Sequence, residues 1–297
     1  MSKVKLTFLG TGTSQGVPII GCHCDVCTST DLKDKRFRSA ALVQCGGLNI
    51  LIDAGPDFRI QMLSQDIRHL DAILLTHNHK DHTGGLDDVR ALNYIDRSAV
   101  EIYCEPRVLQ SIKTEYSYAF AEDKYPGSPE WHIHLIDDSP FSIRQENYGM
   151  LVWKHDVGYG YLQPDGSFTL SKGTSIEPAV LSQEYPVQVT PIRGYHDQMP
   201  ILGYRFGDIA YITDMSSIPE SEFSKLKGLK HLTLNTVSYK PHHSHFSLEE
   251  AVAIARKTGA EHTWLTHLSH TFPRHELFSA QLPEGIAPAW DGLVIED

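Results

Sequence analysis

The chain has 297 residues, enough for one large domain or two small ones with a buried core. Hydrophobic residues make up 41% and charged residues 21%, and no run of 18 apolar residues occurs, which favours a soluble globular protein without a membrane span. The net charge of −11 argues against a large contact with a nucleic-acid backbone.

The N-terminus enters a strand-like pattern at once and shows no signal peptide. Residues 1–10, MSKVKLTFLG, alternate apolar and polar side chains and lack an apolar stretch followed by a small-residue cleavage site. We therefore expect a cytoplasmic protein. Its five cysteines, an odd number, fit reduced thiols and a metal site better than a disulfide framework.

Short apolar runs with helical segments between them predict an α/β layered architecture with mixed sheet, in a single domain over 1–297. The strongest helix has Ser247 as an N-cap, Glu250 to complete a capping box and Gly259 to end it. Helical spacing occurs at 63–70, 86–95 and 247–260. Strands are predicted at 4–10, 48–55, 71–77, 100–106, 185–196, 202–214, 231–237 and 261–270.

Residues 122–180 differ from the rest of the chain because they are rich in Tyr, Gly, Pro and Trp. Turn signals such as PDGS at 164–167 fit short strands. We interpret this segment as a β-rich insertion or a flap over a site, and not as a separate domain.

Four predicted strands end on a side chain that can bind a metal. His77 follows AILLT, and the runs VTPIRGY, IAYIT and TWLT are followed by His196, Asp214 and His267. Ligand sites of open α/β sheets lie beyond the strand ends, because strands are rigid and their terminal loops converge. We therefore expect these four side chains to meet.

The segment LLTHNHKDHTGG, residues 74–85, adds further donors in one loop. His77 and His79 are two positions apart, so they point the same way in extended backbone, whereas Asp81 and His82 are adjacent and need a turn. Each pair needs more ligands, and the other strand ends offer His196, Asp214 and His267. If Asp214 is shared, each of two metals receives four protein ligands.

Two divalent metals about 3.5–4 Å apart generate hydroxide from a bridging water and stabilise charge on phosphorus, so the pattern predicts a metal-dependent hydrolase. No Ser or Cys nucleophile with a paired base stands out. The glycine-rich GTGTSQG at 10–16 lacks the Lys-Ser/Thr ending of a P-loop. We expect Asp53 to orient a histidine ligand or the loop.

The segment GCHCDVC, residues 21–27, places Cys22, Cys24 and Cys27 close together. Neighbouring thiolates repel unless a cation neutralises them, and zinc with sulfur and nitrogen ligands is the usual solution. For the fourth ligand we choose His270, three residues after His267, because the geometry of His23 between two cysteines is poor. A complete set of four ligands predicts a structural zinc site.

These motifs resemble the metallo-β-lactamase fold, whose H-x-H-x-D-H signature stands here at residues 77–82. The chain is more closely similar to the PhnP-like branch, the phosphoribosyl 1,2-cyclic phosphate phosphodiesterases. That group combines the signature with an N-terminal GTG, a C-x-C-x2-C site and T-H-x-x-H, which stand here at 10–12, 22–27 and 266–270.

The resemblance implies an αβ/βα sandwich of two mixed sheets flanked by helices. It places one catalytic metal, manganese or zinc, on His77, His79, His196 and Asp214. It places the second on Asp81, His82, Asp214 and His267, and a structural zinc on Cys22, Cys24, Cys27 and His270. His245 would bind substrate phosphate or protonate the leaving oxygen, so His245 and Asp81 are the predicted catalytic residues.

The function that we expect is hydrolysis of a small cyclic phosphodiester, such as a phosphoribosyl 1,2-cyclic phosphate, by attack of a metal-bridging hydroxide. Three alternatives stay open: an RNase Z-like RNA-processing nuclease, a pyrroloquinoline quinone biosynthesis-type protein of the same fold, and a non-catalytic zinc-stabilised binding protein. We expect no membrane partner, no nucleic acid and, by analogy with the fold, a homodimer.

Overall fold

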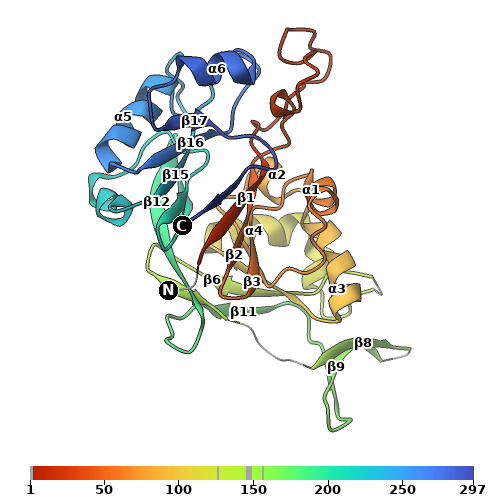
Figure 1. Ribbon diagram of the computed structural model, residues 1–297. Coiled ribbons are helices and arrows are strands. Elements are labelled where there is room, and N and C mark those ends of the chain that lie inside the picture. The colour runs from red at the N-terminus through yellow and green to blue at the C-terminus, as the bar shows by residue number, and fades with distance from the viewer. Residues whose placement is uncertain (1–2, 126, 145–148, 156) are drawn as a thin grey trace.

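The computed structural model describes residues 3–125, 127–144, 149–155 and 157–297. Two mixed β-sheets face each other, and helices cover the outer side of each sheet (Figure 1). This is the αβ/βα sandwich that the sequence predicted. Within the described ranges, no helix combines the length and the apolar character that crossing a membrane requires.

The first sheet comes from the N-terminal half of the chain, one strand at 175–178 and the last strand. Strands β3 to β6 run parallel, so their carboxyl ends lie at one edge, and β2, β1 and β18 continue the sheet antiparallel. In spatial order the strands are β11 (Ser175–Pro178), β6 (Trp131–Leu135), β5 (Val100–Cys104), β4 (Ala72–Leu74), β3 (Leu48–Ile52), β2 (Ala40–Cys45), β1 (Lys5–Gly10) and β18 (Val294–Glu296).

Helices α1 (Phe58–Ser64), α2 (Lys80–Thr83), α3 (Arg90–Asp96) and α4 (Pro106–Glu115) belong to this half. The helix predicted at 63–70 is wrong, because α1 ends there instead. Asp66 takes a left-handed conformation with φ 51°, and the Ile67 N–H donates to the Met62 carbonyl at 3.0 Å, which closes the helix end. The helix predicted at 86–95 is a short 3-10 turn followed by α3.

The second sheet comes from the C-terminal half and β7. Its strands β14 to β17 are parallel, and β12 and β13 form an antiparallel hairpin. In spatial order they are β17 (Ile286–Pro288), β16 (His262–Thr266), β15 (His231–Asn235), β14 (Ile209–Tyr211), β13 (Met199–Phe206), β12 (Val187–His196) and β7 (Phe141–Ile143). The outer helices are α5 (Leu248–Thr258) and α6 (His275–Gln281).

Helix α5 has the start and end that its sequence predicts. The Ser247 backbone N–H donates to the Glu250 carboxylate at 2.8 Å, and the Glu250 N–H donates to the Ser247 hydroxyl at 3.4 Å, so the capping box is confirmed. Gly259 follows the last turn with φ 69°, which a residue without Cβ adopts at little cost.

Apolar side chains fill three layers, one between the sheets and one under the helices on each side. Phe8 of the first sheet and Tyr204 and Tyr211 of the second are fully buried in the central layer. Burying one large apolar side chain stabilises the fold by about 1.5–3 kcal/mol, so this layer fixes the spacing of the two sheets.

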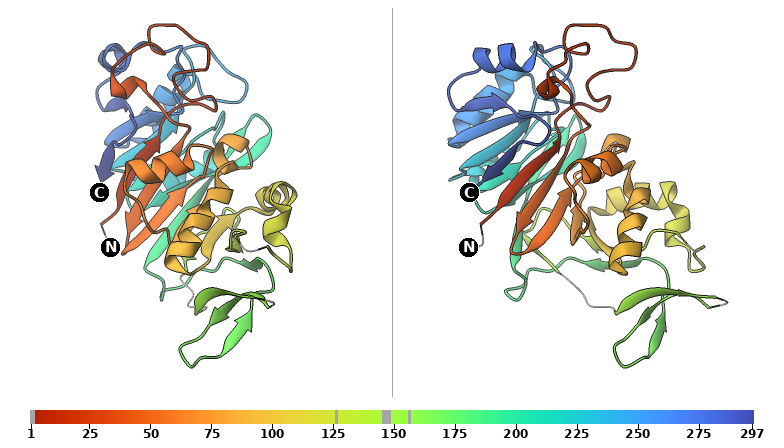
Figure 2. Two further views of the ribbon diagram at one scale, coloured as in Figure 1. Left: turned by 90° about the vertical axis from the view of Figure 1, so that its right-hand side faces the viewer. Right: turned by 45° about the vertical axis from the view of Figure 1, so that its right-hand side comes forward.

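The segment 122–180 contributes strands to both sheets and one separate small sheet. Strands β8 (Met150–Lys154), β9 (Gly158–Leu162) and β10 (Phe168–Leu170) form an antiparallel meander that projects from the body (Figures 1 and 2). The Leu151 N–H donates to the carbonyl of Arg97, which precedes β5, at 2.7 Å. The meander therefore packs at the amino end of the parallel strands and is an extension, not a flap over their carboxyl ends.

Candidate metal centres

The loop after β4 forms one side of a histidine–aspartate centre. His79 is the N-cap of α2, and Asp81 and His82 lie in its single turn. This turn brings the adjacent Asp81 and His82 side chains together, with His82 Nε2 3.3 Å from Asp81 Oδ2. The sequence required such a turn, and α2 supplies it.

Close contacts between backbone atoms of residues 54–55 and 81–85 hold this turn in place. A Cβ on Gly55 would lie 2.0 Å from the Asp81 carbonyl oxygen, and one on Gly85 would lie 2.1 Å from the Gly55 carbonyl oxygen. The Ala54 N–H donates to the His82 carbonyl, and the Gly85 N–H donates to the Ala54 carbonyl, both at 2.8 Å. Only glycine allows this approach at both positions.

The other side of the centre comes from the second sheet. His196 ends β12, Asp214 follows β14, and His267 follows β16. Asp214 and His267 are left-handed, with φ 61° and 56°, and so is Asp53, with φ 63°. Non-glycine residues rarely adopt this conformation, and such strain gathers at functional sites.

The seven predicted ligands lie together. His82 Nε2 is 3.2 Å from Asp214 Oδ2, and His267 Nδ1 is 3.1 Å from the same oxygen. The ring centroid of His79 is 4.7 Å from that of His77 and 4.9 Å from that of His196. Strand exits from both sheets therefore meet at Asp214, as the sequence predicted; the metal-binding roles stay predictions.

The donor atoms fit a divalent cation. Among the described residues, His77 Nε2 is buried without a hydrogen-bond partner, and His82 Nε2 faces carboxylate oxygens of Asp214 and Asp81 at 3.2 and 3.3 Å. The second nitrogen of each ring is occupied: His77 Nδ1 lies 2.9 Å from the Thr76 hydroxyl, and His82 Nδ1 lies 2.7 Å from Asp53 Oδ2. Burying a polar nitrogen without a partner costs folding free energy. A metal ion bound to that nitrogen and to the neighbouring ligands would remove the cost.

Asp53 makes the contacts that the predicted orienting role requires, and the role itself stays a prediction. It accepts from the Thr76 N–H and hydroxyl, both at 2.8 Å, and it contacts His82 at Nδ1, so that Nε2 points to the other donors. Sequence reasoning missed two residues of this network, Thr76 and Ser39, and the Ser39 hydroxyl lies 3.1 Å from His267 Nδ1. Thr76 adjoins the signature, but Ser39 carries no local signal.

The electrostatics of the centre show an excess of negative charge. Burial lowers the pKa of His82, but the Asp214, Asp81 and Asp53 carboxylates outweigh it and raise that pKa well above its usual value. Burial raises the pKa of Asp214, yet the His267 and His82 imidazoles hold it well below its usual range. Three carboxylates around His82 therefore favour positive charge at this point, which is the charge that a divalent cation would bring.

His245 lies at the edge of this centre. Its Nδ1 is 3.8 Å from Asp214 Oδ1 and, within the part of the chain that the structure describes, is buried without a hydrogen-bond partner. Burial, followed by the His267 charge, lowers the pKa of His245 to about 3. His245 forms a compact group with His196 and Asp214, whereas the predicted ligand His79 is exposed.

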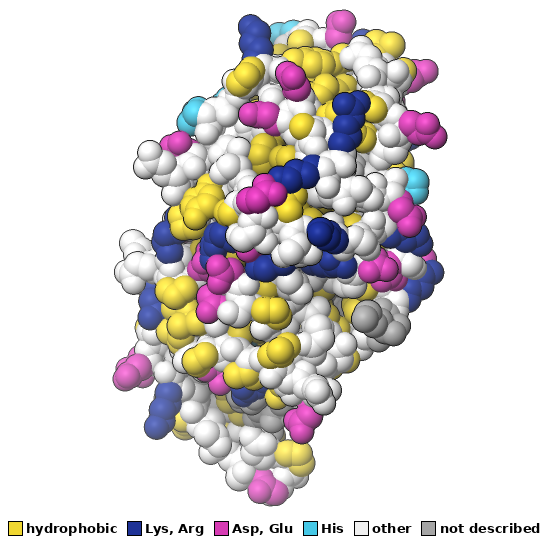
Figure 3. Space-filling view, turned by 90° about the vertical axis from the view of Figure 1, so that its left-hand side faces the viewer, with side chains coloured by type: hydrophobic (Ala, Val, Ile, Leu, Met, Phe, Trp, Pro, Cys, Tyr) yellow, Lys and Arg dark blue, Asp and Glu magenta, His cyan; other side chains and the backbone are white. Residues whose placement is uncertain are grey.

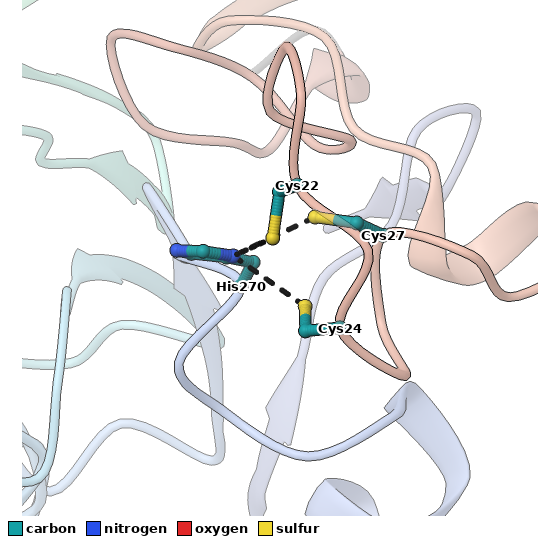
Figure 4. A group of neighbouring side chains, drawn as sticks. All are labelled: Cys22, Cys24, Cys27 and His270. Carbon is teal, nitrogen blue, oxygen red and sulfur yellow. Dashed lines mark hydrogen bonds between the residues drawn. The ribbon is translucent and has the colours of Figure 1, made fainter.

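A second centre joins the N-terminal loop to the loop after β16 (Figure 4). The Sγ atoms of Cys22, Cys24 and Cys27 lie 3.2, 3.5 and 3.5 Å from His270 Nδ1. His23 is exposed. Three sulfurs and one nitrogen around one point match a tetrahedral zinc site, and the structure brings together the four side chains that the sequence predicted.

Comparison with known proteins identifies the class first. A family model described as the β-lactamase superfamily domain matches residues 48–268. A solved structure titled as a new diphosphatase from the PhnP family is 36% identical, covers 99% of this chain and 97% of its own, and has a TM-score of 0.78. The chain therefore belongs to the metallo-β-lactamase superfamily, a group of metal-dependent hydrolases, and is PhnP-like within it.

Two further proteins widen the comparison. An octanoyltransferase of Porphyromonas gingivalis is 37% identical over 98% of this chain, but this chain spans 51% of that relative's length. The Zn²⁺-bound PqqB structure from Methylobacterium extorquens is 18% identical, covers 98% of this chain and 99% of its own, and has a TM-score of 0.67. The PqqB likeness shows the fold alone.

Proposed function

We propose that this protein is a dinuclear metal-dependent phosphodiesterase that hydrolyses a small cyclic phosphodiester, such as a phosphoribosyl 1,2-cyclic phosphate. The observation that carries the proposal is that five of the other predicted ligands gather around the shared Asp214, with the His79 ring beside His77 and His196. Within the described residues, His77 Nε2 is buried there without a hydrogen-bond partner. This donor set is larger than one ion needs.

In this proposal one manganese or zinc ion is held by His77, His79, His196 and Asp214. The other is held by Asp81, His82, Asp214 and His267. When bound, two such ions supply hydroxide at neutral pH and neutralise charge on phosphoryl oxygens. His245 lies near His196 and Asp214, and the proposal keeps it free of metal so that it can carry a proton.

The side chains of the protein have three tasks. Asp53 and Thr76 fix the ring orientations of His82 and His77. The turn of α2 presents Asp81. A phosphate anion beside His245 favours its imidazolium, which gives a proton to the leaving oxygen as the new P–O bond forms and the old one breaks.

The proposed role of the Cys22, Cys24, Cys27 and His270 centre is a structural zinc site. All four donors come from two loops, and with four protein ligands no position is left for substrate. His270 is three residues after His267, so this zinc would hold the N-terminal loop beside the histidine–aspartate centre.

The test is hydrolysis of bis(p-nitrophenyl) phosphate and of a ribosyl 1,2-cyclic phosphate by the metal-loaded protein, before and after chelation. Turnover that chelation removes and manganese or zinc restores is expected. Unchanged turnover after chelation rejects the proposal, and a single tightly bound zinc with no turnover supports the non-catalytic alternative. Size-exclusion chromatography with light scattering tests the predicted homodimer.

A diphosphate is the second candidate substrate, because the 36% identical structure is named a diphosphatase. A nucleoside diphosphate derivative belongs in the same assay, and the larger kcat/KM decides between the two classes. An RNA nuclease is less favoured, because acidic side chains lie among the basic ones on the face in Figure 3 and the net charge is −11. Salt-sensitive binding of transfer RNA would revive it.

A further inference from the structure

Arg107, in the first turn of α4, contacts the loop after β4 and strand β13 beside the centre. Its Nη1 donates to Asn78 Oδ1 at 3.1 Å, and its Nη2 donates to the Pro200 carbonyl at 2.8 Å. Asn78 stands between His77 and His79 in the signature. One guanidinium therefore contacts the loop that carries two of the proposed ligands and the hairpin that carries a third.

The two acceptors are themselves held in place. The Asn78 amide nitrogen donates to the Ser111 hydroxyl at 2.7 Å, so the Asn78 side chain is bound at both ends. Pro200 pairs with Tyr195 in the β12–β13 register, one step before the pair of His196 and Met199. A movement of Arg107 would therefore change the distance between the His77 loop and His196.

A different set of contacts joins the sheets on the other side of the centre. The Ser39 hydroxyl donates to the Gly12 carbonyl at 3.0 Å and lies 3.1 Å from His267 Nδ1. The Leu268 N–H donates to the Thr11 carbonyl at 2.8 Å. These contacts fix His267, a proposed ligand of the second metal, and do not involve Arg107.

We propose that Arg107 is a positioning residue for the first metal. Its guanidinium sets the distance between the loop that carries His77 and His79 and the hairpin that carries His196. The inference rests on the proposed dinuclear site. The planar guanidinium suits the task because it offers two donors in a fixed geometry, which a lysine ammonium does not. Ser39 positions His267 for the second metal in the same way. The affinities for the first and the second metal ion can therefore be changed separately.

The test uses the full chain, stripped of metal and titrated with Mn²⁺, with the electron paramagnetic resonance spectrum reporting single ions and coupled pairs. Arg107→Met removes both donors and keeps the apolar length. We expect its first-metal affinity to fall by about 10–100-fold, the range for residues that orient metal ligands. The coupled-pair signal is lost, while one Mn²⁺ stays bound.

Three variants complete the experiment. Arg107→Lys keeps one donor and recovers part of the affinity, and Ser39→Ala weakens the second ion instead. Arg205→Met is the matched control, because Arg205 donates to the Gly207, Lys225 and Lys227 carbonyls at the far end of β13. We expect Arg205→Met to bind both Mn²⁺ ions with the same affinities as the parent chain.

Two results overturn the inference: an unchanged coupled-pair signal in Arg107→Met, or equal loss of both ions in Arg107→Met and in Ser39→Ala. If Arg107→Met does not fold, the Arg107→Lys titration decides alone, and an unchanged affinity there overturns the inference. If the parent chain never shows the coupled pair, the proposed dinuclear function is wrong. That result differs from the two that overturn the role of Arg107.

Discussion

The two candidate metal centres share the loop after β16, which carries His267 and His270, yet they are built in opposite ways. The cysteine centre takes four donors from two loops, and its apolar surroundings are a small separate cluster around Val17 and Val26. The histidine–aspartate centre takes its donors from the strand ends of both sheets and buries His77, His82 and Asp214 completely or nearly so.

This difference fits the two proposed roles, a site that ties chain segments together and a site that does chemistry. A structural site needs a complete ligand set and little else. A reactive site needs more donors than a single ion uses, held by the rigid core, because small displacements of reacting groups are costly. The left-handed backbone of Asp53, Asp214 and His267 occurs at the second kind of site.

The largest expected effect is that of Asp81→Ala. This change removes a carboxylate from the reactive centre, and we expect kcat to fall by at least about 100-fold, since removal of one charge-stabilising group commonly costs 10²–10³. Steady-state hydrolysis of bis(p-nitrophenyl) phosphate measures it. Asp87→Asn is the control, because this half-buried carboxylate contacts Tyr118 and Arg90 and is not a predicted ligand. Activity retained by Asp81→Ala contradicts the assignment.

Asp53→Asn sharpens the comparison by leaving every ligand in place. An amide nitrogen facing His82 Nδ1 favours the tautomer with hydrogen on Nε2, which cannot bind a metal. We expect affinity for the second ion to fall by about 10–100-fold. Isothermal titration with Mn²⁺ measures it, against Asp71→Asn, a buried carboxylate 3.0 Å from His69 Nε2. Equal Mn²⁺ affinities of Asp53→Asn and Asp71→Asn would show that Asp53 does not orient His82.

Cys27→Ser tests the other centre. We expect the loss of one zinc per chain and of about 2–3 kcal/mol of unfolding free energy, which lowers Tm by roughly 4–12 °C. Activity of the folded protein changes by less than about threefold, because the reactive donors are untouched. Metal analysis and calorimetry check this, with Cys45→Ser as the control. A loss of activity as deep as that of Asp81→Ala would erase the distinction between the centres.

The smallest effect is a difference in acid sensitivity. The Cys27 backbone N–H and the His270 imidazole lower the pKa of Cys24 to about 6, so its thiolate is present above that pH and is lost below it. Zinc binding needs all the thiolates, and burial raises the pKa of Cys27 to about 11, so binding should weaken steadily as pH falls and most steeply below about 6. Burial lowers the pKa values of His77 and His79, so protons compete there only at lower pH.

A chromophoric chelator followed from pH 8 to pH 5 measures the order of metal release. Zinc should leave the cysteine centre before the first metal leaves the histidine–aspartate centre. The reverse order would show that solvent access, and not thiolate protonation, controls the exchange.

The two regions also differ in how well their sequence predicts them. Local signals, namely apolar periodicity and donors at strand ends, predicted three features correctly. These are the strands of the sandwich, the capping box at Ser247 and the convergence of side chains at Asp214. The helix predicted at 63–70 was wrong, because the left-handed Asp66 ends α1 early. The place of the meander at 150–170 could not be read, because turn composition predicts strands but not the surface on which they pack.

What the sequence determined alone is the inventory of donors and their spacing: two histidines in one extended stretch, an adjacent acid–histidine pair, and three cysteines in six residues. The tertiary structure decided how those donors are aimed. Asp53 against His82, Ser39 against His267 and Arg107 across both sheets join residues 29, 228 and up to 93 positions apart. Such contacts depend on the spacing of two packed sheets, and no local pattern encodes that spacing.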